Sequence, residues 1–107
     1  MSQRSKLEYD LQVQVVKVLR DNDCLVFSVA NERNSGIADA LRMRASGLTK
    51  GAPDLVCWTP RGKCWWLELK APKGVRSQEQ KCFEDIAGQL GIGYKLVRSL
   101  EDIKDIR

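Results

Sequence analysis

The pattern of hydrophobic and polar residues predicts a helix near the start of the chain and two more in its second half. Apolar positions of the first region repeat at helical spacing: Leu7, Leu11, Val15, Val18 and Leu19. This spacing predicts a helix over residues 5–22. A second helix is predicted over residues 77–90, where Gly91 ends it, and Ser99 is expected to cap a short terminal helix.

Strands are predicted between these helices. Residues 24–30 are apolar on both alternating faces, so we expect a strand covered on both sides. Residues 54–58 and 63–70 predict a hairpin, and residues 93–98 predict a last strand. Residues 31–48 are basic with loose helical spacing, and we expect a helix and a loop there. This alternation predicts an α/β or α+β fold with helices packed on one central sheet.

Length and composition indicate one globular domain over residues 1–107, of which 43% are hydrophobic and 30% charged. The longest stretch without charge, residues 24–31, is far shorter than the roughly 18 apolar residues of a membrane span. No apolar signal-peptide core follows the polar start. We therefore expect a protein that is not secreted and that works in the cytoplasm or nucleus.

Charge and the missing histidines narrow the chemistry. A net charge of +4 favours a polyanionic partner such as nucleic acid without proving one. The chain has 0 His, which excludes Ser-His and Cys-His nucleophiles and His-ligated zinc. The four cysteines, Cys24, Cys57, Cys64 and Cys82, form no C-x-x-C pair and are expected to be free thiols, mostly small buried hydrophobes.

The most informative group of charged residues is Asp54, Glu68 and Lys70. Side chains alternate along a strand, so Glu68 and Lys70 are expected on one face, and the hairpin brings Asp54 near them. Two neighbouring carboxylates repel, and a hard dication such as Mg²⁺ relieves that repulsion. The ion would acidify a bound water, and the lysine would orient the water or stabilise the transition state. This set fits metal-dependent phosphodiester hydrolysis.

Each of these residues, and two others considered for the site, also has an ordinary structural explanation. Glu68 and Lys70 alone could be a solvated surface pair, although the rest of their strand is strongly apolar. Glu8 borders the inward face of the first helix and is either a third metal ligand or a residue suited to the helix dipole. Gln80 either points toward the sheet or forms a capping box with Ser77, and both roles together are expected to cause strain.

Taken together, the motifs resemble the virus-type replication-repair nuclease (VRR-NUC) domain of the PD-(D/E)xK nuclease superfamily. They are Gly51-Ala52-Pro53-Asp54-Leu55-Val56, Trp66-Leu67-Glu68-Leu69-Lys70-Ala71-Pro72-Lys73-Gly74, Ser77-x-x-Gln80, Gly91 and Tyr94-x-x-Val97. The resemblance extends from Glu8 to Arg98. It implies an α/β, restriction-endonuclease-like αβββαβ core, with a central mixed sheet flanked by helices.

The resemblance also implies roles for individual residues. Asp54 and Glu68 would be ligands of Mg²⁺ or Mn²⁺, together with the backbone carbonyl of Leu69. Lys70 would be the catalytic lysine. Glu8 matches the acidic position that completes the metal site, and Gln80 matches a supporting active-site glutamine.

Members of about this length resemble Holliday-junction resolvases that work as homodimers in bacteria and phage-infected cells, and a four-way junction needs two coordinated cuts. The expected function is therefore structure-selective cleavage of branched DNA, as in DNA repair. Candidate DNA-binding residues are Asn31, Arg33, Arg42, Arg44, Lys50, Lys73, Arg76 and Ser77. A flap-directed or nonspecific nuclease and a non-catalytic DNA-binding module are the alternatives.

Overall fold

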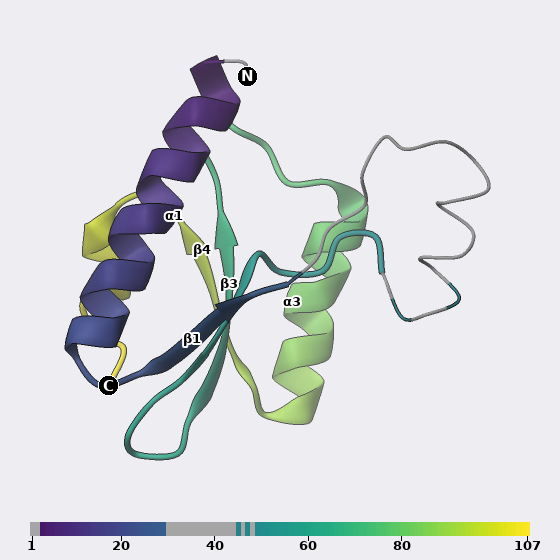
Figure 1. Cartoon of the computed structure of the whole chain (residues 1–107). Coiled ribbons are helices and arrows are strands. Elements are labelled where there is room, and N and C mark those ends of the chain that lie inside the picture. The colour runs from purple at the N-terminus through teal and green to yellow at the C-terminus, as the bar shows by residue number, and fades with distance from the viewer. Residues whose placement is uncertain (1–2, 30–44, 46, 48) are drawn as a thin grey trace.

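The computed structural model describes residues 3–29, 45, 47 and 49–107 and has the expected αβββαβ order (Figure 1). Its elements are α1 (Gln3–Asp21), β1 (Leu25–Ser28), β2 (Leu55–Trp58), β3 (Cys64–Leu69), α3 (Gln78–Leu90), β4 (Gly93–Val97) and the 3₁₀ helix η1 (Leu100–Ile103). Residues 31–48, expected to form a helix and a loop, lie outside the described residues except for 45 and 47. No helix in the described ranges is long and apolar enough to cross a membrane.

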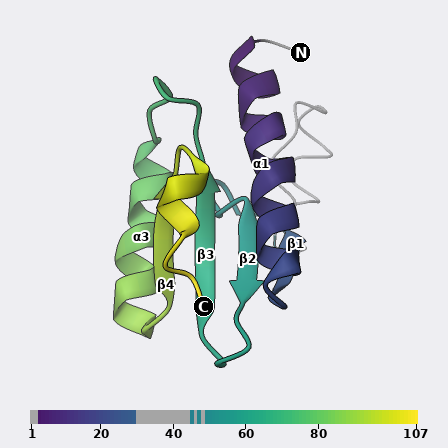
Figure 2. The ribbon, with the colours of Figure 1, turned by 90° about the vertical axis from the view of Figure 1, so that its left-hand side faces the viewer.

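The described strands form one mixed sheet in the order β1-β2-β3-β4. The β1–β2 and β2–β3 pairs are antiparallel, and β3 pairs with β4 in parallel because α3 connects them. Figure 2 shows α1 on one side of the sheet and α3 on the other. The register pairs Leu55 with Leu67, so the residues next in line, Asp54 and Glu68, come from the same end of the hairpin.

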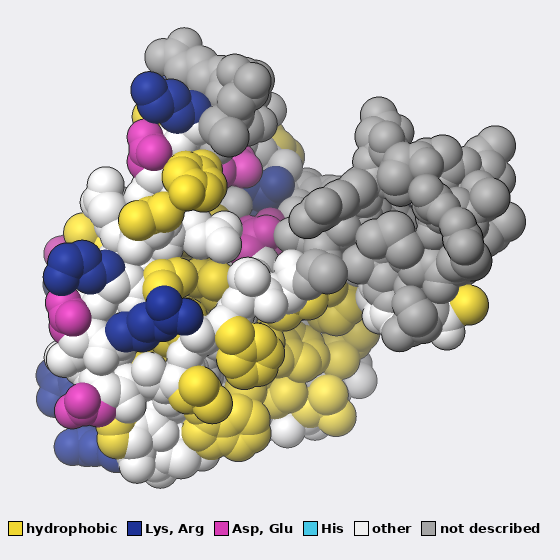
Figure 3. Space-filling model, viewed as in Figure 1, with side chains coloured by type: hydrophobic (Ala, Val, Ile, Leu, Met, Phe, Trp, Pro, Cys, Tyr) yellow, Lys and Arg dark blue, Asp and Glu magenta, His cyan; other side chains and the backbone are white. Residues whose placement is uncertain are grey.

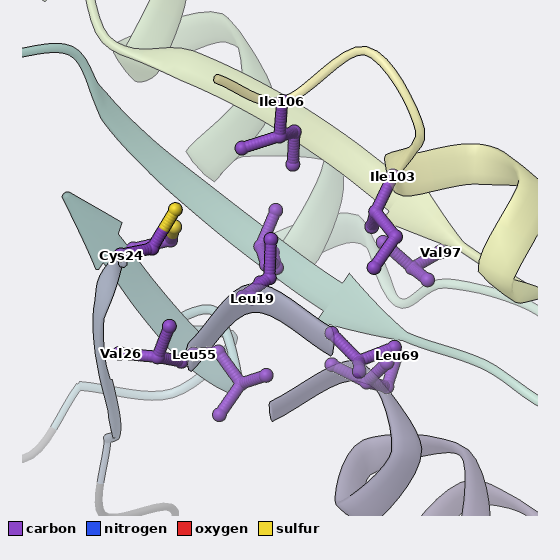
Figure 4. Close-up of a cluster of buried hydrophobic side chains, with 11 residues drawn as sticks. Leu19, Cys24, Val26, Leu55, Leu69, Val97, Ile103 and Ile106 are labelled. Carbon is purple, nitrogen blue, oxygen red and sulfur yellow. The ribbon is translucent and has the colours of Figure 1, made fainter. Parts of the chain in front are cut away.

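The main core lies between the sheet and α1, and η1 helps to close it (Figure 4). Val15 and Leu19 of α1 are buried there, as the helical spacing predicts. Strand side chains of the same face meet them, including Val26, Leu55 and Val97. Val15 packs against this layer, but Leu7 of the same predicted stripe is 47% exposed. The first turns of α1 therefore extend past the core toward the end of the sheet.

The expectation that the first strand is covered on both sides is wrong. Leu25 and Phe27 of β1 are 63% and 48% exposed, and only Val26 is buried. β1 is an edge strand of the described sheet, and α3 packs nearer β3 and β4, where Trp66 contacts Phe83 edge-on at 5.8 Å. Figure 3 shows hydrophobic side chains gathered on the face where β1 lies in front.

The ends of α3 follow from the local sequence. Ser77 is the N-cap, and Gly91 ends the helix in the left-handed conformation at φ 73°, which glycine adopts without the strain of a Cβ. The predicted bounds of this helix are confirmed to within one residue. Its N-terminus points toward the end of the sheet where β2 begins and β3 ends (Figure 1).

The cysteines and tryptophans divide between core and surface. Cys24 and Cys57 are buried, Cys64 is half-buried, and Cys82 is exposed on α3. Burial, together with the neighbouring Cys24 thiol, raises the pKa of Cys57 to about 12. Trp58 is 49% exposed, whereas Trp65 and Trp66 are half-buried.

Candidate active site

A cleft opens at the end of the sheet where β2 begins and β3 ends. Residues from α1, the segment before β2, the end of β3 and the start of α3 line it: Glu8, Lys50, Gly51, Ala52, Asp54, Glu68, Leu69, Lys70, Ser77 and Gln80. Every residue expected for metal binding or catalysis is in this set. In Figure 3, acidic and basic side chains lie together below the N-terminal part of α1.

Asp54 is held against the end of β3. One carboxylate oxygen, Oδ2, accepts a hydrogen bond from the Leu69 N–H at 2.7 Å, and the Asp54 N–H donates to the Leu67 carbonyl at 3.0 Å. The turn before β2 therefore places the Asp54 carboxylate against the last residues of β3.

Glu68 is an unusual acid because it is only 2% exposed. Its Oε1 accepts a hydrogen bond from Gln80 Nε2 at 2.7 Å, and its Oε2 has no hydrogen-bond partner within the described part of the chain. A buried carboxylate oxygen without a donor is costly. Glu68 thus has one oxygen, Oε1, held by Gln80 of α3, and a second oxygen, Oε2, that a proton or a cation would stabilise.

The surroundings keep Glu68 protonated near neutral pH. Burial, and after it the nearby Asp54 carboxylate, raise the pKa of Glu68 to about 8. Glu8 adds to this effect, whereas the Lys70 ammonium opposes it. Asp54 therefore acts on Glu68 as a neighbouring negative charge, which a proton or a cation at Glu68 would offset.

Gln80 fills both roles that the sequence offered, and the expected strain is wrong. Its Nε2 donates to Glu68, while its Oε1 accepts from the Ser77 N–H at 2.8 Å. The Gln80 N–H in turn donates to Ser77 Oγ at 3.2 Å, which completes a capping box. The Gln80 side-chain amide therefore binds Glu68 through its nitrogen and caps α3 through its oxygen, so one side chain fills both roles.

Gly51 allows α3 to approach the cleft closely. Its φ is +83°, and a Cβ built there would lie 2.6 Å from the Cβ of Glu79 and 2.9 Å from the Gln80 nitrogen. No side chain fits in that space. The glycine in the turn before Asp54 therefore sets the distance between this turn and the helix that carries Gln80.

Glu8 and Lys70 complete the lining from the other side. Glu8 Oε1 accepts a hydrogen bond from the Ala71 N–H at 3.2 Å, and the Lys70 N–H donates to the Val97 carbonyl at 3.0 Å. Glu8 thus fixes the residue that follows the lysine. The first helix contributes to the site by holding the backbone next to Lys70.

The chemistry of these groups fits a divalent cation. Asp54 and Glu68 supply two neighbouring carboxylates, one of them with an unpartnered buried oxygen. No set of three His, Cys, Asp or Glu side chains in the described ranges is arranged to hold an ion alone. Mg²⁺ commonly binds one or two carboxylates and completes its shell with water and phosphate oxygens, and the lining of the cleft suits that mode.

The candidate DNA-binding residues have different surroundings. Asn31, Arg33, Arg42 and Arg44 lie outside the described residues. Lys50 lines the cleft and lies 3.6 Å from Glu79, whereas Arg76 is held by Glu84 at 2.9 Å. Lys73 is exposed and is not among the residues that line the cleft, whereas Ser77 lines the cleft and is the N-cap of α3.

One cationic residue near the site was missed by the sequence analysis. Arg98, directly after β4, donates from Nη1 to three carbonyls of the turn that follows Lys70. These partners are 24–27 residues away in the sequence, so no local pattern could have indicated them.

Comparison with known proteins decides the family. The model of the VRR-NUC domain matches residues 2–100. The chain belongs to the VRR-NUC family. A solved structure described as a VRR_NUC domain has a TM-score of 0.68, covers 94% of this chain and 92% of its own, and is 19% identical. That likeness confirms the expected restriction-endonuclease-like α/β fold. The chain matches none of the curated proteins.

VRR-NUC proteins are nucleases of the PD-(D/E)xK type, which generally depend on divalent metals. The protein is thus a nuclease, and DNA is its partner. In this chain the motif letters fall on Pro53-Asp54 and on Glu68-x-Lys70, the residues that line the cleft. The family assignment and the geometry therefore point to the same end of the sheet.

Proposed function

We propose that the protein is a Mg²⁺- or Mn²⁺-dependent endonuclease that cuts branched DNA, with the four-way junction as its preferred substrate. The observation that carries the proposal is the meeting of Asp54, Glu68 and Lys70 in one open cleft. A buried acid whose pKa is raised to about 8 beside a second acid is an arrangement that costs stability unless a cation binds. Such an arrangement is typical of a functional site.

In this proposal the residues divide the work as follows. Asp54, Glu68 and the Leu69 carbonyl would hold the ion, which supplies Lewis acidity and an acidified water when bound. Lys70 orients the attacking water and stabilises the negative charge that builds on the phosphate. Gln80 keeps the Glu68 carboxylate in place, and Glu8 either joins the ion's ligands through water or continues to hold Ala71.

The proposed homodimer follows from the substrate. Resolving a four-way junction requires two cuts in strands related by a two-fold axis, and the described part of one chain brings Asp54, Glu68 and Lys70 together in one cleft. A two-fold dimer presents two clefts with the matching symmetry. Phosphate contacts from basic residues around the cleft, such as Lys50 and Lys73, would give the affinity without reading bases.

The decisive experiment is a cleavage panel with metal omission. A labelled four-way junction, a flap, a linear duplex and a single strand are incubated with the protein in Mg²⁺, in Mn²⁺ and in EDTA. We expect metal-dependent cleavage that is fastest on the junction, with paired symmetric nicks. Cleavage fastest on the flap, or equal on all substrates, would replace the resolvase by the alternative nucleases of the same fold.

Variants test the assigned roles. Asp54→Asn and Lys70→Ala should each lower the cleavage rate by at least about 100-fold. Asp85→Asn and Lys104→Ala, which change exposed residues away from the cleft lining, serve as matched controls and should keep the rate. Full activity of either cleft variant would remove the assignment of roles. Binding of the junction without any cleavage in either metal would favour a non-catalytic DNA-binding module.

A further inference from the structure

Arg98, near the other end of the chain, holds the carbonyl oxygens of the turn that follows Lys70. Arg98 Nη1 lies 2.9 Å from the Ala71 carbonyl, 3.1 Å from the Pro72 carbonyl and 2.9 Å from the Gly74 carbonyl. The turn itself is closed by one backbone hydrogen bond, from the Gly74 N–H to the Ala71 carbonyl at 2.9 Å. Arg98 therefore supplies most of the hydrogen bonds that keep this turn closed.

The turn supports the side chain of Lys70. Gly74 is buried, and a Cβ built on it would lie 3.3 Å from Lys70 Cδ. The aliphatic stem of the lysine thus lies against the Gly74 backbone, whose carbonyl Arg98 holds. A lysine side chain has four rotatable bonds, and a fixed surface under its stem narrows where the ammonium can go.

The same short segment also holds the Lys70 backbone. The Lys70 N–H donates to the carbonyl of Val97, the residue before Arg98. Arg98 is itself anchored, because its N–H donates to Asp102 Oδ2 at 2.8 Å. The end of β4 therefore fixes Lys70 from both sides, at its own peptide and at the turn beyond it.

The chemistry of this contact suits a guanidinium. The group donates from a rigid plane and accepts nothing, and its Nη1 lies within hydrogen-bond distance of all three carbonyl oxygens. Among the described residues, no carboxylate forms an ion pair with Arg98 within 4.0 Å. Because Arg98 contacts three carbonyl oxygens and has no acidic partner among these residues, its role in the fold is to stabilise the turn of residues 71–74.

We propose that Arg98 is a positioning residue that sets the place of the Lys70 ammonium through the turn of residues 71–74. This proposal rests on the proposed function for the role of Lys70 but not for the role of Arg98 in the turn. A catalytic group displaced by about 1 Å can lose about 100-fold in rate. Loss of Arg98 is therefore expected to act on the cleavage step more than on DNA binding.

The test is a double-mutant cycle on cleavage, with binding measured separately. Arg98→Gln should lower the single-turnover cleavage rate in Mg²⁺ by about 10- to 100-fold. The dissociation constant of the junction, measured in Ca²⁺ without cleavage, should change less than about threefold. In a Lys70→Ala background the same substitution should leave the residual rate nearly unchanged. Arg98→Lys, which keeps the charge and fewer donors, should recover part of the rate.

Arg61→Gln is the matched control because Arg61 is an exposed arginine in the turn between β2 and β3, and it should leave the rate unchanged. An equal loss of rate with and without Lys70 would overturn the proposal. A loss that lies entirely in DNA affinity would also overturn it, because Arg98 would then be a phosphate contact.

Amide hydrogen exchange separates this proposal from the proposed function. Exchange of the Gly74 N–H should become at least about tenfold faster in Arg98→Gln than in the unchanged protein, and unchanged exchange would overturn the role of Arg98 in the turn. A folded protein that cuts none of the substrates in either metal would instead overturn the proposed function. If Arg98→Gln is too unstable to assay, Arg98→Lys is measured in both experiments; a smaller loss of rate and a smaller increase in Gly74 exchange are then expected, and no change in either would overturn the proposal.

Discussion

Glu68 and Asp54 lie together at the open end of the β2–β3 hairpin, where the Asp54 carboxylate raises the pKa of Glu68. Asp54 keeps one oxygen on the Leu69 N–H, and Glu68 is buried with one oxygen held by Gln80. Ionisation of Glu68 is disfavoured by its burial and by the Asp54 carboxylate beside it. The fold without metal therefore carries an electrostatic penalty whose size depends on pH.

The stability of the metal-free protein should fall as the pH rises toward 8. The pKa of Glu68 is about 8 in the fold against 4.5 as a reference. Below the reference value both folded and unfolded chains hold the proton, and the contribution of Glu68 to stability is fully present. Between these two pH values only the folded chain holds it, so the free energy of unfolding decreases, and above them the loss is complete.

The variant Glu68→Gln should remove this part of the pH dependence. It keeps an oxygen for the Gln80 amide, and it should raise the free energy of unfolding at pH 8 by about 1–3 kcal/mol in EDTA. Urea unfolding between pH 5 and pH 9 measures it, with Asp85→Asn as the control for an exposed acid. An unaltered slope in Glu68→Gln would show that Glu68 is ionised in the fold at neutral pH.

Divalent ions should stabilise the protein, and the effect should grow with pH. Binding requires the ionised carboxylates, so the ion competes with the proton on Glu68. At about 100 times its dissociation constant, Mg²⁺ or Mn²⁺ should add about 2.7 kcal/mol to the free energy of unfolding. Asp54→Asn should lose this gain, whereas Asp85→Asn should keep it. Equal stabilisation by NaCl at matched ionic strength would contradict a specific ion site.

Replacing Gln80 by an acid should separate its two roles. Gln80→Glu keeps the capping box, because glutamate serves at this helix position, but it replaces the donor to Glu68 by a carboxylate. We expect a loss of about 1–3 kcal/mol in the free energy of unfolding at pH 8 and a smaller loss at pH 5, where Glu68 is protonated. Gln78→Glu, at an exposed position of the first turn of α3, is the control and should be neutral or slightly stabilising. Equal effects of the two variants would contradict the Gln80–Glu68 contact.

The role of Gly51 has a matched comparison within the chain. Gly51 and Gly62 have nearly the same backbone angle, φ +83° and +86°, but only Gly51 has atoms within 4 Å of a built Cβ. Gly62→Ala should cost about 1–2 kcal/mol for the left-handed backbone alone. Gly51→Ala should cost clearly more and should lower cleavage, because the turn must move away from α3 and Gln80. Thermal unfolding and the cleavage rate measure the two effects, and equal losses would contradict the close contact.

The hairpin and the helices were predictable because their signals are local. Alternation and turn residues fixed the neighbours of Asp54, and the Ser77 and Gly91 signals fixed α3 to within one residue. The bringing together of Asp54, Glu68 and Lys70 followed from strand alternation, without any knowledge of long-range contacts. The cleft is therefore largely a consequence of two adjacent strand ends.

The predictions that were wrong, and the residue that was missed, concern contacts with partners far away in the sequence. Residues 24–30 are apolar on both faces, but α3 reaches only the β3–β4 side of the sheet, so Leu25 and Phe27 are exposed. The strain expected for Gln80 was wrong because both partners lie at opposite ends of its amide. Arg98 carries no local signal, and its carbonyl partners are set by the parallel pairing of β3 with β4.

The placement of the thiols makes the protein convenient for fluorescence work. Cys24 and Cys57 are sealed in the interior, Cys64 is partly covered with a pKa raised by burial, and Cys82 is exposed two positions beyond Gln80. A maleimide dye should therefore attach first at Cys82, without any engineered cysteine. The dye would sit on the outside of the helix whose first turn borders the cleft, close enough to report a DNA strand arriving there.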